Sequence, residues 1–356
     1  MGTAWTRIDR RAACAALAGM GLGLIWPRLT ARAEDWTCRV ITLEAEAGAV
    51  HPPVVSAVAL HPNGKAIALA GDDHRIRIVD IESGKTLEQR PAHGDWVRAL
   101  AYSPTGDVLA SAGNDGRIVL WNAASAQQLN ELAALAHPVV AIAFNPSGQS
   151  LASTGYAEDV RVFDVTGHKQ TARLSGPCPD MRALAYSPDL RHLASGGRNG
   201  IVRVWDVPAG KVIQEYKAHQ RRVWGVAFSP DGRTIVSCGE DGKTRFQPLG
   251  GNDHFVLDSP GAKVMSLAYC GPEHLATGGS DNLVRIWDVS RRAQVAELAG
   301  HTGSVVTLAY GGNVLISAGY DTTVRVWTSN SNLVRGSTTP SDRVGSRWEP
   351  RSRAQQ

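Results

Sequence analysis

Residues 279–290 read GSDNLVRIWDVS, and closely similar phrases begin at three other glycines: GNDGRIVLWNAA at Gly113, GRNGIVRVWDVP at Gly197 and GYDTTVRVWTSN at Gly319. Each phrase opens with Gly, Asn and Asp, which favour a turn, and continues with β-branched and aromatic residues, which favour a strand. The same turn and strand therefore occur several times along the chain. Such recurrence indicates a repeat architecture in which one structural unit is used again and again.

The spacing of the residue that ends the phrase gives the length of the unit. Aligned positions are separated by 42, 42, 42, 42, 40 and 40 residues, and they are Val79, Trp121, Phe163, Trp205, Gln247, Trp287 and Trp327. Between them, runs such as VRALAYSP (97–104) and VLASAG (108–113) are short, and phrases such as SPDG supply the Pro and Gly of tight turns. Four short strands in about 40 residues are typical of propeller blades, whereas a helical solenoid needs longer segments.

The order of these motifs resembles that of the WD-repeat family, and seven copies extend from about residue 38 to residue 328. The resemblance implies an all-β fold, a seven-bladed β-propeller of four-stranded antiparallel blades. It also implies that a blade can contain a hydrogen-bond relay of His, Ser or Thr, Asp and Trp. Two blades have the full set of relay residues: His93, Ser111, Asp115 and Trp121 in the second, and His301, Ser317, Asp321 and Trp327 in the last.

The other five blades lack one or more relay residues. The departures are Leu69 and Val79 in the first blade, Ala157 and Phe163 in the third, Asn199 in the fourth, Gln247 in the fifth and an absent His before the first strand of the sixth. We expect the blades without a relay to be held by apolar packing alone.

A propeller must also close, because otherwise its first and last blades present unpaired strand edges. The final unit shows three strand patterns and stops at Thr328. The sequence CRVITLEAEAGAVH, which begins at Cys38, resembles the outer strands of the other units. We therefore expect residues 38–44 to complete the last blade, within a propeller domain that spans residues 34–328.

The first 33 residues have the pattern of a secretory signal peptide. Arginines precede an uncharged run at residues 12–26, and ARA at residues 31–33 is a small-x-small cleavage pattern. The run has 15 residues, fewer than the roughly 20 that span a bilayer. We expect an exported, periplasmic bacterial protein with no membrane span after cleavage. An uncleaved apolar anchor is the alternative, and the pair Arg10 and Arg11 is twin-arginine-like but leaves the export route open between the twin-arginine and general pathways.

Charge and cysteine content argue against several functions. The formal charge is +4, but residues 1–33 alone carry +4 and residues 329–356 carry +3, so the propeller itself is near −3. We therefore expect no nucleic-acid binding. We expect residues 329–356 to be a disordered basic tail, with a docking motif around Trp348 as the alternative. Five cysteines without a C-x-x-C motif predict no metal and no cofactor, while one disulfide stays open.

Ser, His and Asp of the relay invite a catalytic interpretation, but they recur at structural positions, whereas an active site is needed only once. The candidate binding residues therefore lie on the surface. In the family, the narrow face is lined by residues of the turns and by the starts of the first strands. These positions include Asp180, Lys263 and Met265, and the partner-binding residues we predict among them are Trp96, Arg98, Tyr156, Arg182, Arg198, Arg222, Trp224 and Tyr320.

The function we expect is that of a monomeric, non-enzymatic scaffold that binds a protein or peptide through the narrow face. A solvated rim with scattered aromatic residues is the alternative reading of that face. A second function remains open, an enzyme or sensor that binds a small molecule in the central channel, with or without redox chemistry. Fold alone does not decide between them.

Overall fold

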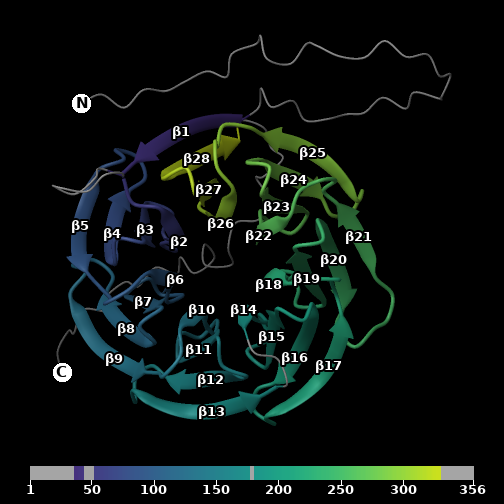
Figure 1. Cartoon of the computed structure of the whole chain (residues 1–356), viewed down its shortest axis with the longest axis horizontal. Helices are drawn as coiled ribbons and strands as arrows, with labels where there is room; N and C mark the ends of the chain where they lie inside the picture. Colours follow the sequence, from purple (N-terminus) through teal and green to yellow (C-terminus); the bar gives the residue numbers. More distant parts are fainter. Residues whose placement is uncertain (1–35, 44–51, 177–179, 330–356) are drawn as a thin grey trace, which may run out of the picture.

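The computed structural model describes residues 36–43, 52–176 and 180–329. Within these ranges the chain forms seven four-stranded antiparallel sheets and no helix. The sheets are arranged as a closed ring around a central axis (Figure 1). The all-β, seven-bladed propeller is therefore confirmed. The predicted signal peptide lies outside the described residues, as does the predicted tail apart from Ser329.

Each blade is a meander in which strands follow one another outward from the axis (Figure 1). The strands of the first four blades are β2 (Val55–Leu60), β3 (Ala66–Gly71), β4 (Arg75–Asp80) and β5 (Thr86–Pro91); β6 (Val97–Tyr102), β7 (Val108–Gly113), β8 (Arg117–Asn122) and β9 (Gln128–Ala134); β10 (Val139–Phe144), β11 (Ser150–Gly155), β12 (Asp159–Asp164) and β13 (Lys169–Ser175); and β14 (Met181–Tyr186), β15 (His192–Gly197), β16 (Ile201–Asp206) and β17 (Lys211–Lys217).

The remaining three blades follow the same order, except that the last takes its outer strand from the start of the chain. Their strands are β18 (Val223–Phe228), β19 (Thr234–Gly239), β20 (Lys243–Pro248) and β21 (Phe255–Asp258); β22 (Val264–Tyr269), β23 (His274–Gly279), β24 (Val284–Asp288) and β25 (Ala293–Leu298); and β26 (Val305–Gly311), β27 (Val314–Gly319), β28 (Thr323–Ser329) and β1 (Trp36–Thr42).

The core lies between neighbouring blades, and the middle strands supply most of it. In β3, the sequence AIALAG places Ile67 and Leu69 out of contact with solvent on one face of the sheet and Ala68 on the other. Small and large apolar residues thus alternate against the adjacent blades. Outer strands such as β5, with the sequence TLEQRP, are largely exposed. Apolar surface buried between blades is the main stabilising contribution in such a ring.

The ring is closed by β1, which pairs antiparallel with β28 and places Cys38 opposite Trp327. This confirms closure by the N-terminal strand. The strand begins two residues earlier than predicted and ends at Thr42, whereas Glu44 lies outside the described residues. From β1, the guanidinium of Arg39 donates a hydrogen bond to the carbonyl oxygen of Ile81 in the first blade, at 2.9 Å. The outer strand of the last blade therefore also contacts the first blade.

Antiparallel pairing decides which loops share a face. The first residue of each first strand lies opposite the last residue of the second, as Met181 does opposite Gly197. The starts of the first strands and the turns between second and third strands therefore meet at one end of the channel. We call this end the mouth face. The turns between first and second strands lie at the opposite face.

Candidate functional site

A β-bulge at the start of every first strand shapes the mouth of the channel. In each blade the register shifts between the first and third residues of that strand, as between Val97 and Ala99. A bulge leaves one residue outside the ladder and redirects its side chain. The seven residues at these positions are Ser56, Arg98, Val140, Arg182, Trp224, Met265 and Val306.

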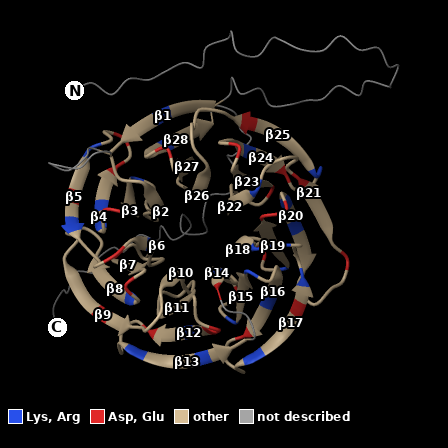
Figure 2. Cartoon of the chain, viewed as in Figure 1, with Lys and Arg blue, Asp and Glu red and all other residues tan. Residues whose placement is uncertain are grey.

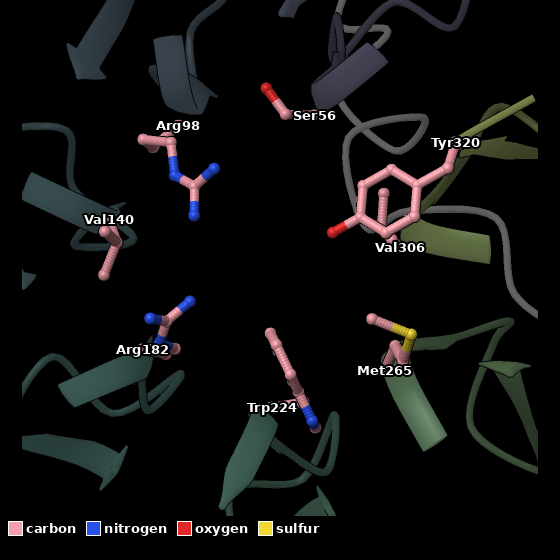
Figure 3. A pocket seen from close by; sticks show the side chains of 8 residues that line it. All are labelled: Ser56, Arg98, Val140, Arg182, Trp224, Met265, Val306 and Tyr320. Atoms are coloured by element: carbon pink, nitrogen blue, oxygen red, sulfur yellow. The ribbon is translucent and has the colours of Figure 1, made fainter. Parts of the chain in front are cut away.

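These seven residues, together with Tyr320, line a cavity of about 120 Å³. We call it the mouth cavity. Figure 3 shows the side chains of Arg98, Arg182 and Tyr320 pointing into it from different blades. Four of the eight residues are among those that the sequence predicts to bind a partner, and Met265 lies on the face where the sequence predicts it. Ser56, Val140 and Val306 were not predicted, and the fixed position of the bulge in each repeat would have revealed them.

Beside the cavity, five residues from neighbouring blades form a connected set, which we call the Arg182 cluster: Tyr156, Asp180, Arg182, Arg222 and Trp224. Arg182 Nη2 donates to the Tyr156 hydroxyl at 3.0 Å, and its guanidinium stacks 5.2 Å from the Tyr156 ring and 5.5 Å from the Trp224 ring. The guanidinium of Arg222 also stacks on Trp224, 5.2 Å from the centre of its ring. Cation–π contacts of this kind hold rings and guanidinium groups in fixed relative positions.

Asp180 joins the two arginines of the cluster. Its carboxylate accepts from Arg182 Nε at 2.6 Å and from Arg222 Nη2 at 3.2 Å. Asp180 has a φ of 62°, in the left-handed region that Asp adopts more readily than most residues. The backbone conformation of Asp180, just before β14, therefore places this carboxylate between the arginines of two blades. The sequence analysis located Asp180 on the correct face but assigned it no role.

The other predicted binding residues occupy different places on the mouth face. Arg98 lines the cavity and stacks 5.6 Å from the ring of Trp96, which precedes β6. Tyr320 is 51% exposed and also lines the cavity. Arg198 is exposed on the turn after β15 and belongs neither to the cavity lining nor to the Arg182 cluster. Four of the eight predicted residues thus line the cavity, and three more, Trp96, Tyr156 and Arg222, contact one of those four.

The relay residues are connected inside their blades. In the second blade, His93 Nδ1 lies 2.9 Å from the Asp115 carboxylate, His93 Nε2 lies 2.7 Å from Ser111 Oγ, and Trp121 Nε1 donates to Ser111 Oγ at 2.8 Å. Because the carboxylate can only accept, Nδ1 carries the proton, and Nε2 accepts from the serine hydroxyl. His301, Ser317, Asp321 and Trp327 form the same chain in the last blade.

Burial controls protonation in both relays. Desolvation lowers the pKa of His93 and of His301, although the neighbouring Asp115 and Asp321 favour the charged imidazole. Burial would raise the pKa of the Asp115 carboxyl, but hydrogen bonds from the Gly94 amide and from His93 outweigh it and the pKa is lowered. The relay is therefore a neutral imidazole beside an ionised carboxylate, with its groups bonded to one another.

The expectation that the remaining blades rely on apolar packing alone is wrong. Each contains polar pairs: some are relay partners that the blade retains, and others are ion pairs between third-strand arginines and nearby acids. The pairs are Arg77 with Asp73 in the first blade, Arg161 with Asp159 in the third, Trp205 with Ser195 and Arg203 with Glu215 in the fourth, His219 with Ser237 and Asp241 in the fifth, and Trp287 with Thr277 and Arg285 with Asp281 in the sixth.

Three cysteines are described, Cys38, Cys238 and Cys270, and all are buried and unpaired with one another. Burial raises the pKa of the Cys270 thiol to about 12. Cys178, a further candidate for the disulfide left open by the sequence, lies outside the described residues. Among the described residues, no three His, Cys, Asp or Glu side chains lie close enough together to hold a metal ion. The described part of the chain also contains no apolar helix long enough to cross a bilayer.

The ring of blades and the cavity at its axis define a seven-bladed propeller with a cavity at one end of the channel. Comparison with known families agrees with this. A family model described as IFT122 first beta-propeller matches residues 54–288, and one described as WD domain, G-beta repeat matches residues 292–328. The chain belongs to the WD-repeat family of β-propellers, which generally serve as protein-interaction scaffolds.

Individual relatives match only short parts of the chain. The anaphase-promoting complex subunit cdh1 of Dictyostelium discoideum is 45% identical over 51 residues, which are 14% of this chain and 7% of the relative. The ribosome biogenesis protein YTM1 of Saccharomyces cerevisiae is 40% identical over 65 residues, 18% and 14% of the two chains. The protein transport protein sec13 of Aspergillus fumigatus is 36% identical over 84 residues, 21% and 28%. The chain thus spans well under a third of each.

Proposed function

We propose that this propeller is a non-enzymatic scaffold that binds a protein or peptide segment across its mouth face. The observation that carries the proposal is the Arg182 cluster beside the mouth cavity. Arginine and aromatic side chains dominate the energetics of protein interfaces, and here four of them lie in mutual contact. Side chains held in this way lose little conformational freedom when a partner arrives.

The size of the cavity supports a segment over a small molecule. Sites that enclose a whole small molecule measure roughly 300–1,000 Å³, whereas the mouth cavity measures about 120 Å³. It is large enough for one or two side chains of a partner. Around it, Tyr156 is 40% and Tyr320 is 51% exposed. A segment lying across the mouth face would cover these rings as one side chain enters the cavity.

Nucleic acid is the less favoured macromolecular partner. Acidic and basic residues are interspersed along the blades, and no continuous basic stripe is seen (Figure 2). Phosphate backbones are recognised by such stripes. The near-neutral, slightly acidic charge of the propeller agrees with this preference.

We place the scaffold in the bacterial envelope, as an exported monomer of the periplasm. Support comes from residues 1–33, whose arginines, apolar run and ARA motif follow the order of a signal peptide. Fractionation of cells that produce the full chain tests this directly. Recovery of a shortened chain with the periplasmic contents supports export, and recovery of the uncleaved chain in the cytosol contradicts it.

Capture of partners from an envelope fraction tests the binding role. Partners that bind the full chain are identified by mass spectrometry, and the dissociation constant of each is then measured with purified variants. Trp224→Ala should weaken binding by about 30-fold or more, because truncation of a hot-spot residue costs about 2 kcal/mol or more. Trp96→Ala should act in the same direction through loss of the ring beneath Arg98.

Ile213→Ala is the matched control. Ile213 is an apolar residue that is 48% exposed on the outer strand β17, away from the mouth face. It should leave the dissociation constant unchanged. All variants should retain the wild-type melting temperature within a few degrees. If Ile213→Ala weakens binding while Trp224→Ala does not, the binding surface lies on the outer strands and the proposal is wrong.

A further inference from the structure

We propose that the mouth cavity accepts an acidic side chain, Asp or Glu, of the bound protein segment, and that Arg98 and Arg182 hold its carboxylate. This inference rests on the proposed function, because it specifies what the partner inserts into the cavity. It concerns the chemistry of the partner, which a general scaffold role leaves open.

The positive charge of the cavity lining is only partly offset, because Asp180, beside the cavity, pairs with Arg182 while Arg98 has no ion pair among the described residues. Two of the cavity's eight lining residues are arginines, and none carries a carboxylate. Figure 3 shows both guanidinium groups directed toward the centre of the cavity. Like charges that face the same partly enclosed space repel one another more strongly than they would in open water. An anion placed between them relieves this repulsion and gains a charge-assisted hydrogen bond to each.

Arg98 is available to such a ligand. Its guanidinium stacks on the ring of Trp96, at 5.6 Å, and within the described part of the chain it takes part in no ion pair and no side-chain hydrogen bond. Its planar array of five N–H donors therefore remains open on the cavity side. A guanidinium that rests on an aromatic ring is held in place and still presents its edge to a carboxylate.

Arg182 is only partly used by its neighbours. Its Nε donates to Asp180, and its Nη2 donates to the Tyr156 hydroxyl. Nη1 has no such partner in the described residues. Because Asp180 is shared with Arg222, three guanidinium groups around the mouth are offset by one carboxylate. These three guanidinium groups therefore carry more charge than the one carboxylate paired with them, and Arg98 and Arg182 both keep N–H donors for an anion.

The rest of the lining selects a side chain of limited size. A cavity of about 120 Å³ is well below the roughly 300–1,000 Å³ of sites that enclose a whole small molecule, so it suits a single side chain such as that of Asp or Glu. Val140, Met265 and Val306 supply apolar walls for the methylene groups. The exposed rings of Tyr156 and Tyr320 lie at the edge, where the backbone and flanking side chains of the segment would rest.

A peptide library provides the test without knowledge of the natural partner. A display library of random twelve-residue peptides is selected on the immobilised full chain and in parallel on the variants Arg98→Gln, Arg233→Gln and Trp224→Ala. Arg233 is exposed at the turn between β18 and β19, on the opposite face, so its replacement removes the same charge elsewhere. A random-sequence RNA oligonucleotide pool is tested on the same surfaces at the same salt concentration.

We expect the wild-type chain and Arg233→Gln to enrich peptides with Asp or Glu at one fixed position. We expect Arg98→Gln to lose that preference, and a selected peptide to bind Arg98→Gln at least tenfold more weakly than wild type. Replacement of its acid by Asn or Gln should cause a comparable loss on wild type and a smaller one on Arg98→Gln, since the two groups act on each other.

Enrichment by the wild-type chain that depends on Trp224 but shows no acidic position overturns this inference and leaves the scaffold function standing. Absence of any peptide enrichment relative to Trp224→Ala counts against both. Retention of the RNA pool in place of peptides also contradicts both, because it makes the arginines a phosphate site. Thermal melting of Arg98→Gln confirms that the variant is folded before its selection is interpreted.

Discussion

Ser111 and Ser153 occupy the same position in the second strands of neighbouring blades, yet their hydroxyl groups have different surroundings. Ser111 Oγ contacts both His93 and Trp121. Ser153 Oγ is buried without a hydrogen-bond partner among the described residues, because its blade has Phe163 where the relay has Trp. The two residues offer a matched measure of what the relay contributes.

Ser111→Ala should destabilise the protein by about 1–3 kcal/mol, because the buried His93 and Trp121 nitrogens lose their partner. Ser153→Ala should be neutral or slightly stabilising, since it removes a buried polar atom that makes no hydrogen bond. Urea denaturation of both variants, followed by circular dichroism, measures the difference. Equal losses in the two variants would show that the serines act through packing and that the relay is not a stabilising network.

The two lowered histidine pKa values predict a pH dependence of stability. In the unfolded chain, His93 and His301 regain an ordinary pKa of about 6.5. As the pH falls below that value, the unfolded state binds protons that the folded state resists, so the free energy of unfolding decreases. The contribution of these two histidines to the free energy of unfolding is therefore fully present above about pH 6.5 and is progressively lost as the pH falls below that value. The lowered pKa of Asp115 and of Asp321 adds a further loss below about pH 3.8.

Melting temperatures measured between pH 8 and pH 5 check this dependence. We expect a steady decrease below pH 6.5 in the wild-type chain. The double variant His93→Asn and His301→Asn should be less stable at pH 8 but should show a shallower decrease. A wild-type melting temperature that stays constant to pH 5 would contradict the assignment of neutral, desolvated imidazoles in the relays.

Sequence motifs predict residues of the relay well, because each relay lies within one blade and its members recur at fixed spacing. They predict the Arg182 cluster less well. Its contacts join Tyr156, Arg182 and Arg222, which come from three consecutive blades. Both arginines bind Asp180, and no sequence motif predicts the positive φ of that residue. Contacts between units depend on the rotation from one blade to the next, which a repeat pattern in sequence does not contain.

The strands illustrate the same division. Turn residues and alternating apolar residues predict four strands in each unit, and the structure has them. The bulge at the start of each first strand was not predicted, since nothing in VRALAY or MRALAY departs from ordinary strand alternation. Its effect is large, because it directs Arg98, Arg182 and Trp224 toward the channel. One local irregularity, repeated seven times, thus supplies seven of the eight residues that line the mouth cavity.

The fifth blade shows how an element adapts when a repeat residue is lost. Gln247 stands where other blades have Trp, and its Nε2 donates to the carbonyl of Gly251 at 2.6 Å. From the fourth blade, Gln214 donates to the same carbonyl at 3.2 Å. The outer strand β21 has only four residues. Gln247 thus holds the loop around Gly251, which precedes the shortened outer strand. The prediction that this blade relies on apolar packing alone did not include such a polar contact.

Closure of the ring depends on β1, whose two faces contact different blades. Trp36 and Cys38 pack with apolar residues of the sixth and last blades, including Val284 and Trp327. Ile41 packs with the first blade, including Val55. At the opposite face, a Cβ on Gly64 would lie 2.9 Å from Gly312 Cα, so the first and last blades also meet directly through glycine backbones. The ends of the ring are therefore joined by β1 and also by direct contact between the first and last blades.

Ile41→Ala should destabilise the protein by about 2–5 kcal/mol, as expected for truncation of a buried aliphatic side chain. Thr42→Ala, at an exposed position of the same strand, should change stability by about 0.5 kcal/mol or less. Deletion of residues 36–43 should have a stronger and different effect. It exposes the edge of β28, an unpaired strand that can pair with another chain. We expect the deletion variant to lose its single sharp melting transition and to associate.

Calorimetry and size-exclusion chromatography measure both consequences. The distinction between the variants is informative because a simple loss of contacts lowers the melting temperature and leaves one cooperative transition, as in Ile41→Ala. Opening of the ring instead allows blades to separate from one end, since each blade contacts mainly its two neighbours. A deletion variant that stays monomeric and melts in one sharp step would contradict this. It would show that the contacts between the first and last blades keep the ring closed without β1.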